Sequence, residues 1–225
     1  MKPANIWAAL GASGTGKDSW VKQQLRKLKP RRLLIWDAMD EYGELAEEVA
    51  SLADLAERTK AARYALRFVW RRPAWTPGAS TKPGDDEKDR AARFSMFCKI
   101  AWERASTEWA PRSCTLVVTE LSQVTRPSYA PPMWAALTTA GRHKGFHIIG
   151  ISQFPAQIDK AFLGNCTLIH SGALSNKRHR EAVAAEIGCD AELLRTMPNL
   201  AWVEYSRETR QVTQGVLRFD APRPP

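Results

Sequence analysis

Three features that would indicate a membrane-spanning, secreted or cysteine-ligated metal-binding protein are missing from this sequence. Long apolar runs are absent, because no stretch approaches the roughly 20 residues that a helix needs to span a bilayer. The N-terminal residues lead straight into a strand pattern, which leaves no room for a signal peptide. The cysteines have no CxxC or metal-type spacing; they are Cys98, Cys114, Cys166 and Cys189. We therefore expect a soluble protein with reduced, buried thiols and no transmembrane segment of its own.

Internal repeats and a second domain are also missing. The 225 residues suffice for one well-buried α/β domain, so we predict a single domain over residues 1–219 and a Pro-rich tail over residues 220–225. Acidic residues are in deficit, since 33 Lys and Arg stand against 24 Asp and Glu, for a net charge of +9. This balance favours a polyanionic partner, but it does not separate nucleic acid from an anionic membrane surface.

A glycine-rich loop near the N-terminus is the strongest chemical signal in the chain. The apolar run Ile6–Leu10 leads into the pattern Gly-x4-Gly-Lys, which ends at Lys17, and a helical pattern follows. This order of strand, loop and helix is typical of a phosphate-binding P-loop, and it makes a simple Gly-rich turn the weaker alternative. The glycines let backbone N–H groups turn toward a phosphate, and the lysine ammonium and the helix N-terminus add positive potential. The predicted nucleotide-binding residues are Gly11, Ala12, Ser13, Gly14, Thr15, Gly16, Lys17, Asp18 and Ser19.

Strand patterns alternate with helical patterns through most of the chain. Further strands are predicted at residues 31–37, 64–70, 114–120, 146–152 and 166–170. Helices are predicted at residues 45–55, 86–109, 132–140, 155–163 and 176–187. This alternation predicts an α/β fold with a mostly parallel central sheet flanked by helices. Residues 202–205 and 212–219 alternate in polarity and predict a C-terminal antiparallel hairpin.

Two polar side chains stand at the carboxyl ends of predicted strands. Glu120 ends a strongly apolar strand, and Gln153 ends the next strand in sequence. Ligands of open α/β sheets bind at these strand ends. A carboxylate there can orient or deprotonate the water that attacks a γ-phosphate, and an amide can sense that phosphate before hydrolysis. Either residue alone is more often a solvated strand end, but their order after a P-loop favours a nucleotide hydrolase.

The segments around these residues resemble a known superfamily. Residues 145–159, GFHIIGISQFPAQID, are similar to the sensor-glutamine region of the HerA/FtsK superfamily of DNA-pumping ATPases, and residues 165–169 resemble the strand that follows it there. Residues 37–42, DAMDEY, resemble the D-x-x-G-E-Y turn of the HerA branch, with Asp40 in place of the glycine. The small size is most similar to the genome-packaging ATPases of tectivirus-type, membrane-containing viruses.

The resemblance implies a RecA-like P-loop NTPase core that assembles into a homo-oligomeric ring, usually hexameric. Such a ring threads double-stranded DNA and hydrolyses ATP with Mg²⁺ at its subunit interfaces. By position, Lys17 would bind phosphate, Glu120 would be the catalytic carboxylate and Gln153 the sensor. Arg142 would be an arginine finger for a neighbouring subunit, or else a solvated turn residue. The implied location is the host cytoplasm or the packaging vertex of a virion, where vertex or membrane proteins would be partners.

Two positions depart from the superfamily pattern. Asp18 stands where Ser or Thr usually follows the P-loop lysine, and Thr119 stands where Asp usually precedes the catalytic glutamate. These side chains flank Mg²⁺ in P-loop enzymes, so Asp18 and Thr119 together predict a metal site in which a hydroxyl and a carboxylate have exchanged places. A decayed, inactive site is the rival interpretation.

Other functions stay open on the sequence alone. A filamentous-phage type of assembly ATPase shares the core, although it usually adds a transmembrane segment. A small-molecule kinase would use the same P-loop, with the long loop over residues 71–86 as a lid, but it would not need Glu120 and Gln153. A non-catalytic, nucleotide-gated assembly protein is the third alternative, and it would require that Asp18 and Thr119 do not bind Mg²⁺.

Overall fold

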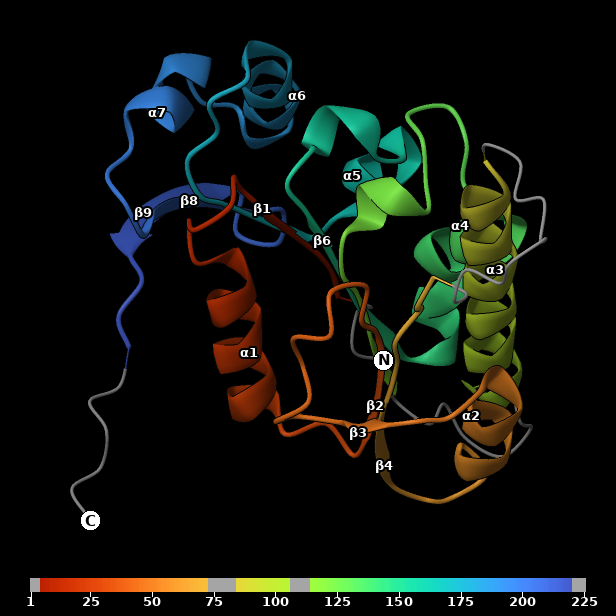
Figure 1. Cartoon of the computed structure of the whole chain (residues 1–225). Coiled ribbons are helices and arrows are strands. Elements are labelled where there is room, and N and C mark those ends of the chain that lie inside the picture. The colour runs from red at the N-terminus through yellow and green to blue at the C-terminus, as the bar shows by residue number, and fades with distance from the viewer. Residues whose placement is uncertain (1–4, 73–83, 106–113, 220–225) are drawn as a thin grey trace.

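A nine-stranded sheet runs through the part of the chain that the computed structural model describes, residues 5–72, 84–105 and 114–219 (Figure 1). Its order is β3-β4-β2-β5-β6-β1-β7-β8-β9. The strands are β1 Ile6–Leu10, β2 Arg32–Trp36, β3 Glu47–Glu48, β4 Tyr64–Phe68, β5 Cys114–Val118, β6 Phe146–Ser152, β7 Leu168–Ser171, β8 Ala201–Ser206 and β9 Gln211–Val216. The helices are α1 Lys17–Leu28, α2 Leu52–Arg58, α3 Asp85–Ala105, α4 Pro132–Ala140, α5 Lys160–Asn165, α6 Lys177–Ile187 and α7 Ala191–Thr196, with 3-10 turns η1 Leu121–Gln123, η2 Gly141–Lys144 and η3 Pro155–Gln157.

The predicted α/β fold is confirmed, because every pairing from β3 to β7 in the sheet order is parallel and only the pairings of β8 with β7 and with β9 are antiparallel. Strand β1 lies between β6 and β7, and β5 lies between β2 and β6. Parallel strands end at one edge of a sheet, so the segments that follow β1, β5 and β6 meet there although they are far apart in sequence. This edge carries the candidate site.

Alternate side chains of the strands form two hydrophobic layers, one on each face of the sheet. In β2, Leu33 and Ile35 pack in the layer that contains Trp20 of α1. Leu34 and Trp36 point the other way, into the layer beneath α3, α4 and α5. Figure 1 shows α1 and α3 on opposite sides of the sheet. Fully burying one large apolar side chain stabilises the fold by about 1.5–3 kcal/mol, so a shift of one residue in a strand would be costly.

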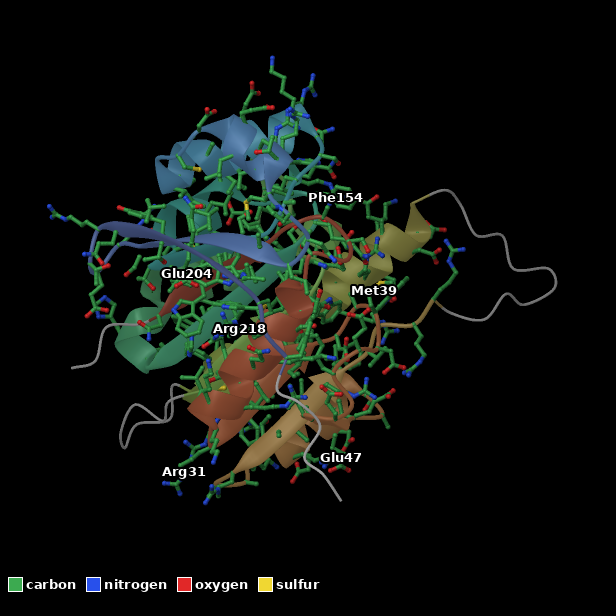
Figure 2. All side chains as sticks on the ribbon, turned by 90° about the vertical axis from the view of Figure 1, so that its left-hand side faces the viewer. Arg31, Met39, Glu47, Phe154, Glu204 and Arg218 are labelled. Atoms are coloured by element: carbon green, nitrogen blue, oxygen red, sulfur yellow. The ribbon has the colours of Figure 1, made fainter. Side chains whose placement is uncertain are left out.

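The C-terminal hairpin returns the chain to the P-loop helix. Strand β8 pairs antiparallel with β7 and with β9. Beyond β9, Leu217 joins the apolar layer that contains Trp20 of α1. Gln23 Nε2 of α1 donates a 2.7 Å hydrogen bond to the carbonyl oxygen of Arg218. The end of the described chain is therefore fastened beside α1, and Figure 2 shows Arg218 in front of that helix.

Some predicted elements differ in the structure. The helix predicted at residues 45–55 is replaced by the short strand β3 and by α2, because the Ser51 hydroxyl caps a new helix by accepting from the Asp54 N–H. The helix predicted at residues 155–163 is divided between η3 and α5, which Asp159 caps. Helix α7 was not predicted. The predicted Pro-rich tail and much of the loop over residues 71–86 lie outside the described residues.

Two further expectations concern burial and membranes. The cysteines Cys98, Cys114 and Cys166 are free thiols and buried, and Cys189 is partly buried. Among the residues that the structure describes, no helix is both long and apolar enough to cross a bilayer.

Candidate active site

The loop between β1 and α1 has a conformation that only glycine accommodates at two of its positions. Gly11 has φ 145°, and a Cβ atom there would lie 2.5 Å from Thr15 Oγ1. Gly16 has φ 86°, and its Cβ would lie 2.7 Å from Leu217 Cδ2. The Thr15 hydroxyl donates a 2.8 Å hydrogen bond to the Ala12 carbonyl oxygen, which closes the loop on itself. The loop therefore takes the compact form in which successive N–H groups can meet an anion.

Lys17 begins α1, and its side chain is only 7% exposed. The Lys17 ammonium lies 2.8 Å from Asp18 Oδ2. The other carboxylate oxygen of Asp18 accepts a 3.1 Å hydrogen bond from the hydroxyl of Tyr42. Asp18 is thus held from both sides in the first turn of α1, where the helix dipole favours negative charge.

Glu120 and Gln153 come together at the ends of β5 and β6. Gln153 Nε2 donates a 2.8 Å hydrogen bond to Glu120 Oε1. Glu120 is buried and has φ 46° and ψ 52°, the left-handed conformation that a non-glycine residue seldom adopts. Such backbone outliers occur most often at functional sites, where the surrounding structure enforces them. Sequence reasoning identified both residues, but not this direct contact.

Thr119 and Arg142 are placed differently. Thr119 is buried beside Glu120, and its hydroxyl accepts a 2.8 Å hydrogen bond from the Ala38 N–H. No direct contact joins Thr119 to Asp18 among the hydrogen bonds of the described residues. The backbone of Arg142 lies in η2, just before β6, whereas its side chain lies outside what the structure describes.

One cavity of about 610 Å³ joins the P-loop to the two strand-end residues. Its lining residues are Ser13, Gly14, Gly16, Lys17, Asp18, Ser19, Lys22, Met39, Glu41, Glu120, Gln153, Leu200 and Phe219. The structure therefore brings most of the predicted P-loop residues together with Glu120 and Gln153, whereas Thr119 does not line the cavity. Sequence reasoning missed Leu200 and Phe219, which come from the two ends of the C-terminal hairpin and carry no motif.

The acidic turn after β2 supports the cavity wall. Asp37 is fully buried, and its two oxygens accept hydrogen bonds of 3.0 and 2.9 Å from the N–H groups of Glu41 and Tyr42. Arg67 of β4 neutralises Asp37 at 3.1 Å and also pairs with Asp40, whose pKa its hydrogen bond lowers. Burial raises the pKa of Glu41, and the neighbouring charge of Asp18 adds to the effect. The turn is thus rigid and brings a second acidic side chain to the lysine and carboxylate of the P-loop.

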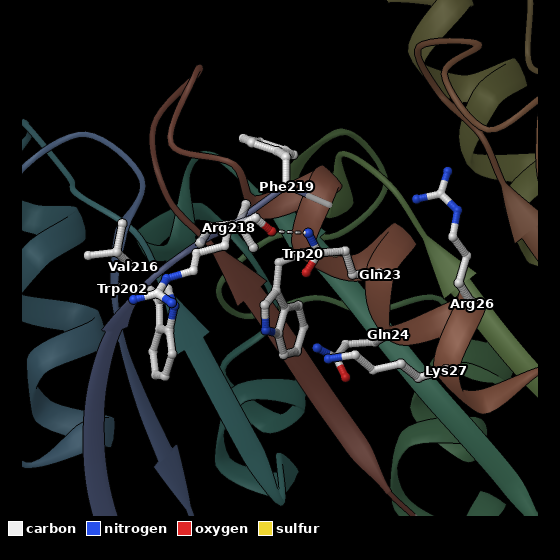
Figure 3. A pocket seen from close by; sticks show the side chains of 10 residues that line it. Trp20, Gln23, Gln24, Arg26, Lys27, Trp202, Val216, Arg218 and Phe219 are labelled. Atoms are coloured by element: carbon white, nitrogen blue, oxygen red, sulfur yellow. Dashed lines mark hydrogen bonds between the residues drawn. The ribbon is translucent and has the colours of Figure 1, made fainter. Parts of the chain in front are cut away.

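A larger hollow of about 740 Å³ lies between α1 and the end of β9 (Figure 3). It is lined by Trp20, Gln23, Gln24, Arg26, Lys27, Trp202, Val216, Leu217, Arg218 and Phe219. This hollow contains neither P-loop glycines nor a carboxylate, so size alone does not make it the reactive site. Phe219 lines both spaces.

The sheet order, the P-loop and the strand-end glutamate define the fold of a P-loop NTPase. No protein-family model matches the chain. The chain is 23% identical over 192 residues to Protein P9 of Pseudoalteromonas phage PM2, covering 85% of this chain and 78% of that protein.

Solved structures of other proteins are similar to this chain in fold. The genome packaging NTPase B204 of Sulfolobus turreted icosahedral virus 2, in complex with AMPPCP, has a TM-score of 0.70 at 16% identity, covering 95% of this chain and 97% of that one. VirB4 of Thermoanaerobacter pseudethanolicus has a TM-score of 0.67 at 12% identity, covering 96% and 90%. These similarities confirm the predicted fold and the predicted resemblance to viral genome-packaging ATPases.

Proposed function

We propose that this chain is an ATPase that pumps double-stranded DNA during viral genome packaging. The observation that carries the proposal is the cavity in which Lys17, Glu120 and Gln153 meet. A phosphate-binding loop with a paired carboxylate and amide suits hydrolysis of a γ-phosphate better than simple nucleotide binding. Further support comes from B204, a genome packaging NTPase whose structure was solved with AMPPCP.

Each side chain has a proposed role in ATP hydrolysis. The loop from Gly11 to Ser19 holds the phosphates, and Lys17 neutralises their charge. Glu120 orients and deprotonates the attacking water. Gln153, which now donates to Glu120, can exchange that bond for one to the γ-phosphate and so report hydrolysis. Arg142 would complete the site of a neighbouring subunit in a ring, usually a hexamer.

The oxygen donors of the cavity fit a hard cation such as Mg²⁺, which would screen the phosphate charge. Asp18 lines the cavity with a carboxylate in the first turn of α1. Thr119 directly precedes Glu120 of the cavity in the chain, and its hydroxyl keeps a lone pair beyond the bond that it accepts from the Ala38 N–H. We retain the exchanged pair of Asp18 and Thr119 as the proposed ligands, with Asp18 the better supported of the two.

The proposed DNA contacts are basic residues in two groups, one within residues 82–90 and one within residues 177–180. Lys177 and Arg178 are exposed in the first turn of α6, where the helix dipole disfavours positive charge and a polyanion would compensate it. Lys88 is exposed on α3. Arg90 packs on the ring of Trp70 and donates to Gln123 at 3.0 Å, which makes it a weaker candidate. Two more candidates are Arg180, held by the Ser175 carbonyl oxygen, and Lys82, which lies outside the described residues.

The proposed place of action is the packaging vertex of a virion or the host cytoplasm. A ring of this chain would dock there on vertex or membrane proteins. The runner-up function is a filamentous-phage type of assembly ATPase, and a small-molecule kinase is a weaker alternative.

ATP turnover with and without double-stranded DNA tests the proposal. We expect hydrolysis that DNA stimulates, loss of hydrolysis in Lys17→Ala, and normal hydrolysis in Lys27→Ala, a matched exposed lysine on α1. An ATP hydrolysis rate that double-stranded DNA does not change would favour the assembly ATPase. Turnover only with a small phosphate acceptor would favour the kinase, and ATP binding without turnover would favour a nucleotide-gated assembly protein.

A further inference from the structure

Asp18 is engaged by groups of its own chain on both carboxylate oxygens. Oδ2 lies 2.8 Å from the Lys17 ammonium, and Oδ1 accepts from the Tyr42 hydroxyl at 3.1 Å. A serine or threonine at position 18 has no charge and could not form this ion pair with the ammonium. In this chain the P-loop lysine already has an anionic partner before any phosphate arrives.

Tyr42 presents its hydroxyl from a fixed position. Its side chain is fully buried, and its N–H donates to Asp37 Oδ2 at 2.9 Å. Asp37 is itself fully buried and paired with Arg67. The Tyr42 hydroxyl is the donor of the bond to Asp18 Oδ1. Tyr42 therefore limits the rotation of Asp18 and keeps the second oxygen on Lys17.

This arrangement has a consequence for a phosphate that enters the cavity. The phosphate must compete with Asp18 for the ammonium of a lysine whose side chain is only 7% exposed. Asp18 then becomes an uncompensated anion beside another anion, and Glu41 adds a further carboxylate to the same cavity. Like charges at close range disfavour binding unless one of them is neutralised.

We propose that Asp18 is a latch on Lys17, that Tyr42 is the positioning residue of this latch, and that the latch makes ATP binding depend on a divalent cation. The inference rests on the proposed nucleotide site. Lys17 leaves Asp18 readily only when the Asp18 charge is neutralised, so ATP without a cation binds poorly. The latch thereby prevents the site from filling with metal-free nucleotide that it cannot hydrolyse.

The test compares the Kd of ATP in EDTA with its Kd in Mg²⁺, measured by calorimetry without any turnover. The readout is the Kd in EDTA divided by the Kd in Mg²⁺. We expect Asp18→Asn to lower this ratio about tenfold, chiefly through tighter binding in EDTA, since a hydrogen-bonded charge has that order of effect. Tyr42→Phe should lower the ratio about threefold, and it should have no further effect when added to Asp18→Asn.

Tyr64→Phe is the matched control, because its hydroxyl contacts Cys114 Sγ, away from the cavity. The Kd ratio of Tyr64→Phe should equal that of the wild type. If it falls as much as the ratio of Tyr42→Phe, the effect of Tyr42→Phe comes from a general loss of packing and not from Asp18. If Asp18→Asn binds metal-free ATP no more tightly than the wild type, the latch is overturned. If the Tyr42→Phe effect persists in the Asp18→Asn background, Tyr42 does not act through Asp18. If the wild type binds ATP in neither buffer, the proposed nucleotide site itself fails.

Discussion

Glu120→Gln separates ATP binding from hydrolysis. The amide has nearly the same shape as the carboxylate but cannot accept a proton. General base catalysis contributes about 10²–10⁴-fold to a rate, so kcat should fall by that factor. The Kd of ATP should stay within about threefold of the wild-type value, because the P-loop and Lys17 supply the phosphate contacts.

The stability cost of this change should be small. The Glu120 carboxylate accepts a hydrogen bond from Gln153 at 2.8 Å. A neutral acceptor in place of a charged one weakens such a bond by about 1 kcal/mol. For a domain of this size that lowers Tm by about 2–4 °C, which leaves the variant folded in the assay.

A coupled ATPase assay gives kcat, and calorimetry gives the Kd of ATP. Glu204→Gln is the matched control, since Glu204 also faces one polar partner, His170 at 3.3 Å, but lies on β8 away from the cavity. Turnover within about tenfold of the wild-type rate in Glu120→Gln would refute the role of base. Loss of ATP binding with the fold intact would place Glu120 in nucleotide binding instead.

Three further predictions concern the metal pair, pH and salt. Asp18→Ser and Thr119→Asp should each lower Mg²⁺-dependent turnover, and the double variant should recover much of the loss; strict additivity would show that the two residues share no ion. Burial lowers the pKa of His147 to about 4, below the value of about 6.5 in the unfolded chain, so its contribution to stability is complete above pH 6.5 and is lost as pH falls toward 4. The free energy of unfolding, measured with urea, should therefore be about 2–3 kcal/mol lower at pH 4.5 than at pH 7. An equal decrease in His147→Phe would show that His147 is not the cause. DNA affinity should fall steeply between about 50 and 200 mM salt, with a shallower slope in the double variant Lys177→Ala, Arg178→Ala; a flat response in the wild type would exclude phosphate-backbone binding.

Local patterns predicted the fold and the P-loop well, because each depends on residues that are close in sequence. The apolar run of β6 and the glycine pattern up to Lys17 can each be recognised from consecutive residues, although distant segments also hold them, as in the bond from the Ala12 N–H to the Ala173 carbonyl oxygen. The helix predicted over residues 45–55 is wrong because contacts with a distant strand override the local pattern. Its apolar spacing suits a helix, but Val49 donates to the carbonyl oxygen of Arg67, and the chain beside β4 is extended until Ser51 starts α2.

The contacts that complete the site depend on distant residues, and a single sequence does not contain them. The bond from Tyr42 to Asp18 spans 24 positions, and Leu200 and Phe219 reach the cavity only because the hairpin folds back onto α1. Such pairings follow from the sheet order. The Asp18 departure did signal an unusual charge beside Lys17, whereas nothing in the sequence showed that Tyr42 would hold it.

The most direct test of ATP-driven DNA pumping is displacement of a third strand from a DNA triplex. We expect the wild-type protein to displace the strand with ATP and Mg²⁺, and Lys17→Ala and Glu120→Gln to fail although both remain folded. Displacement that persists in Lys17→Ala, or a wild type that hydrolyses ATP on duplex DNA without displacing the strand, would contradict the proposed function.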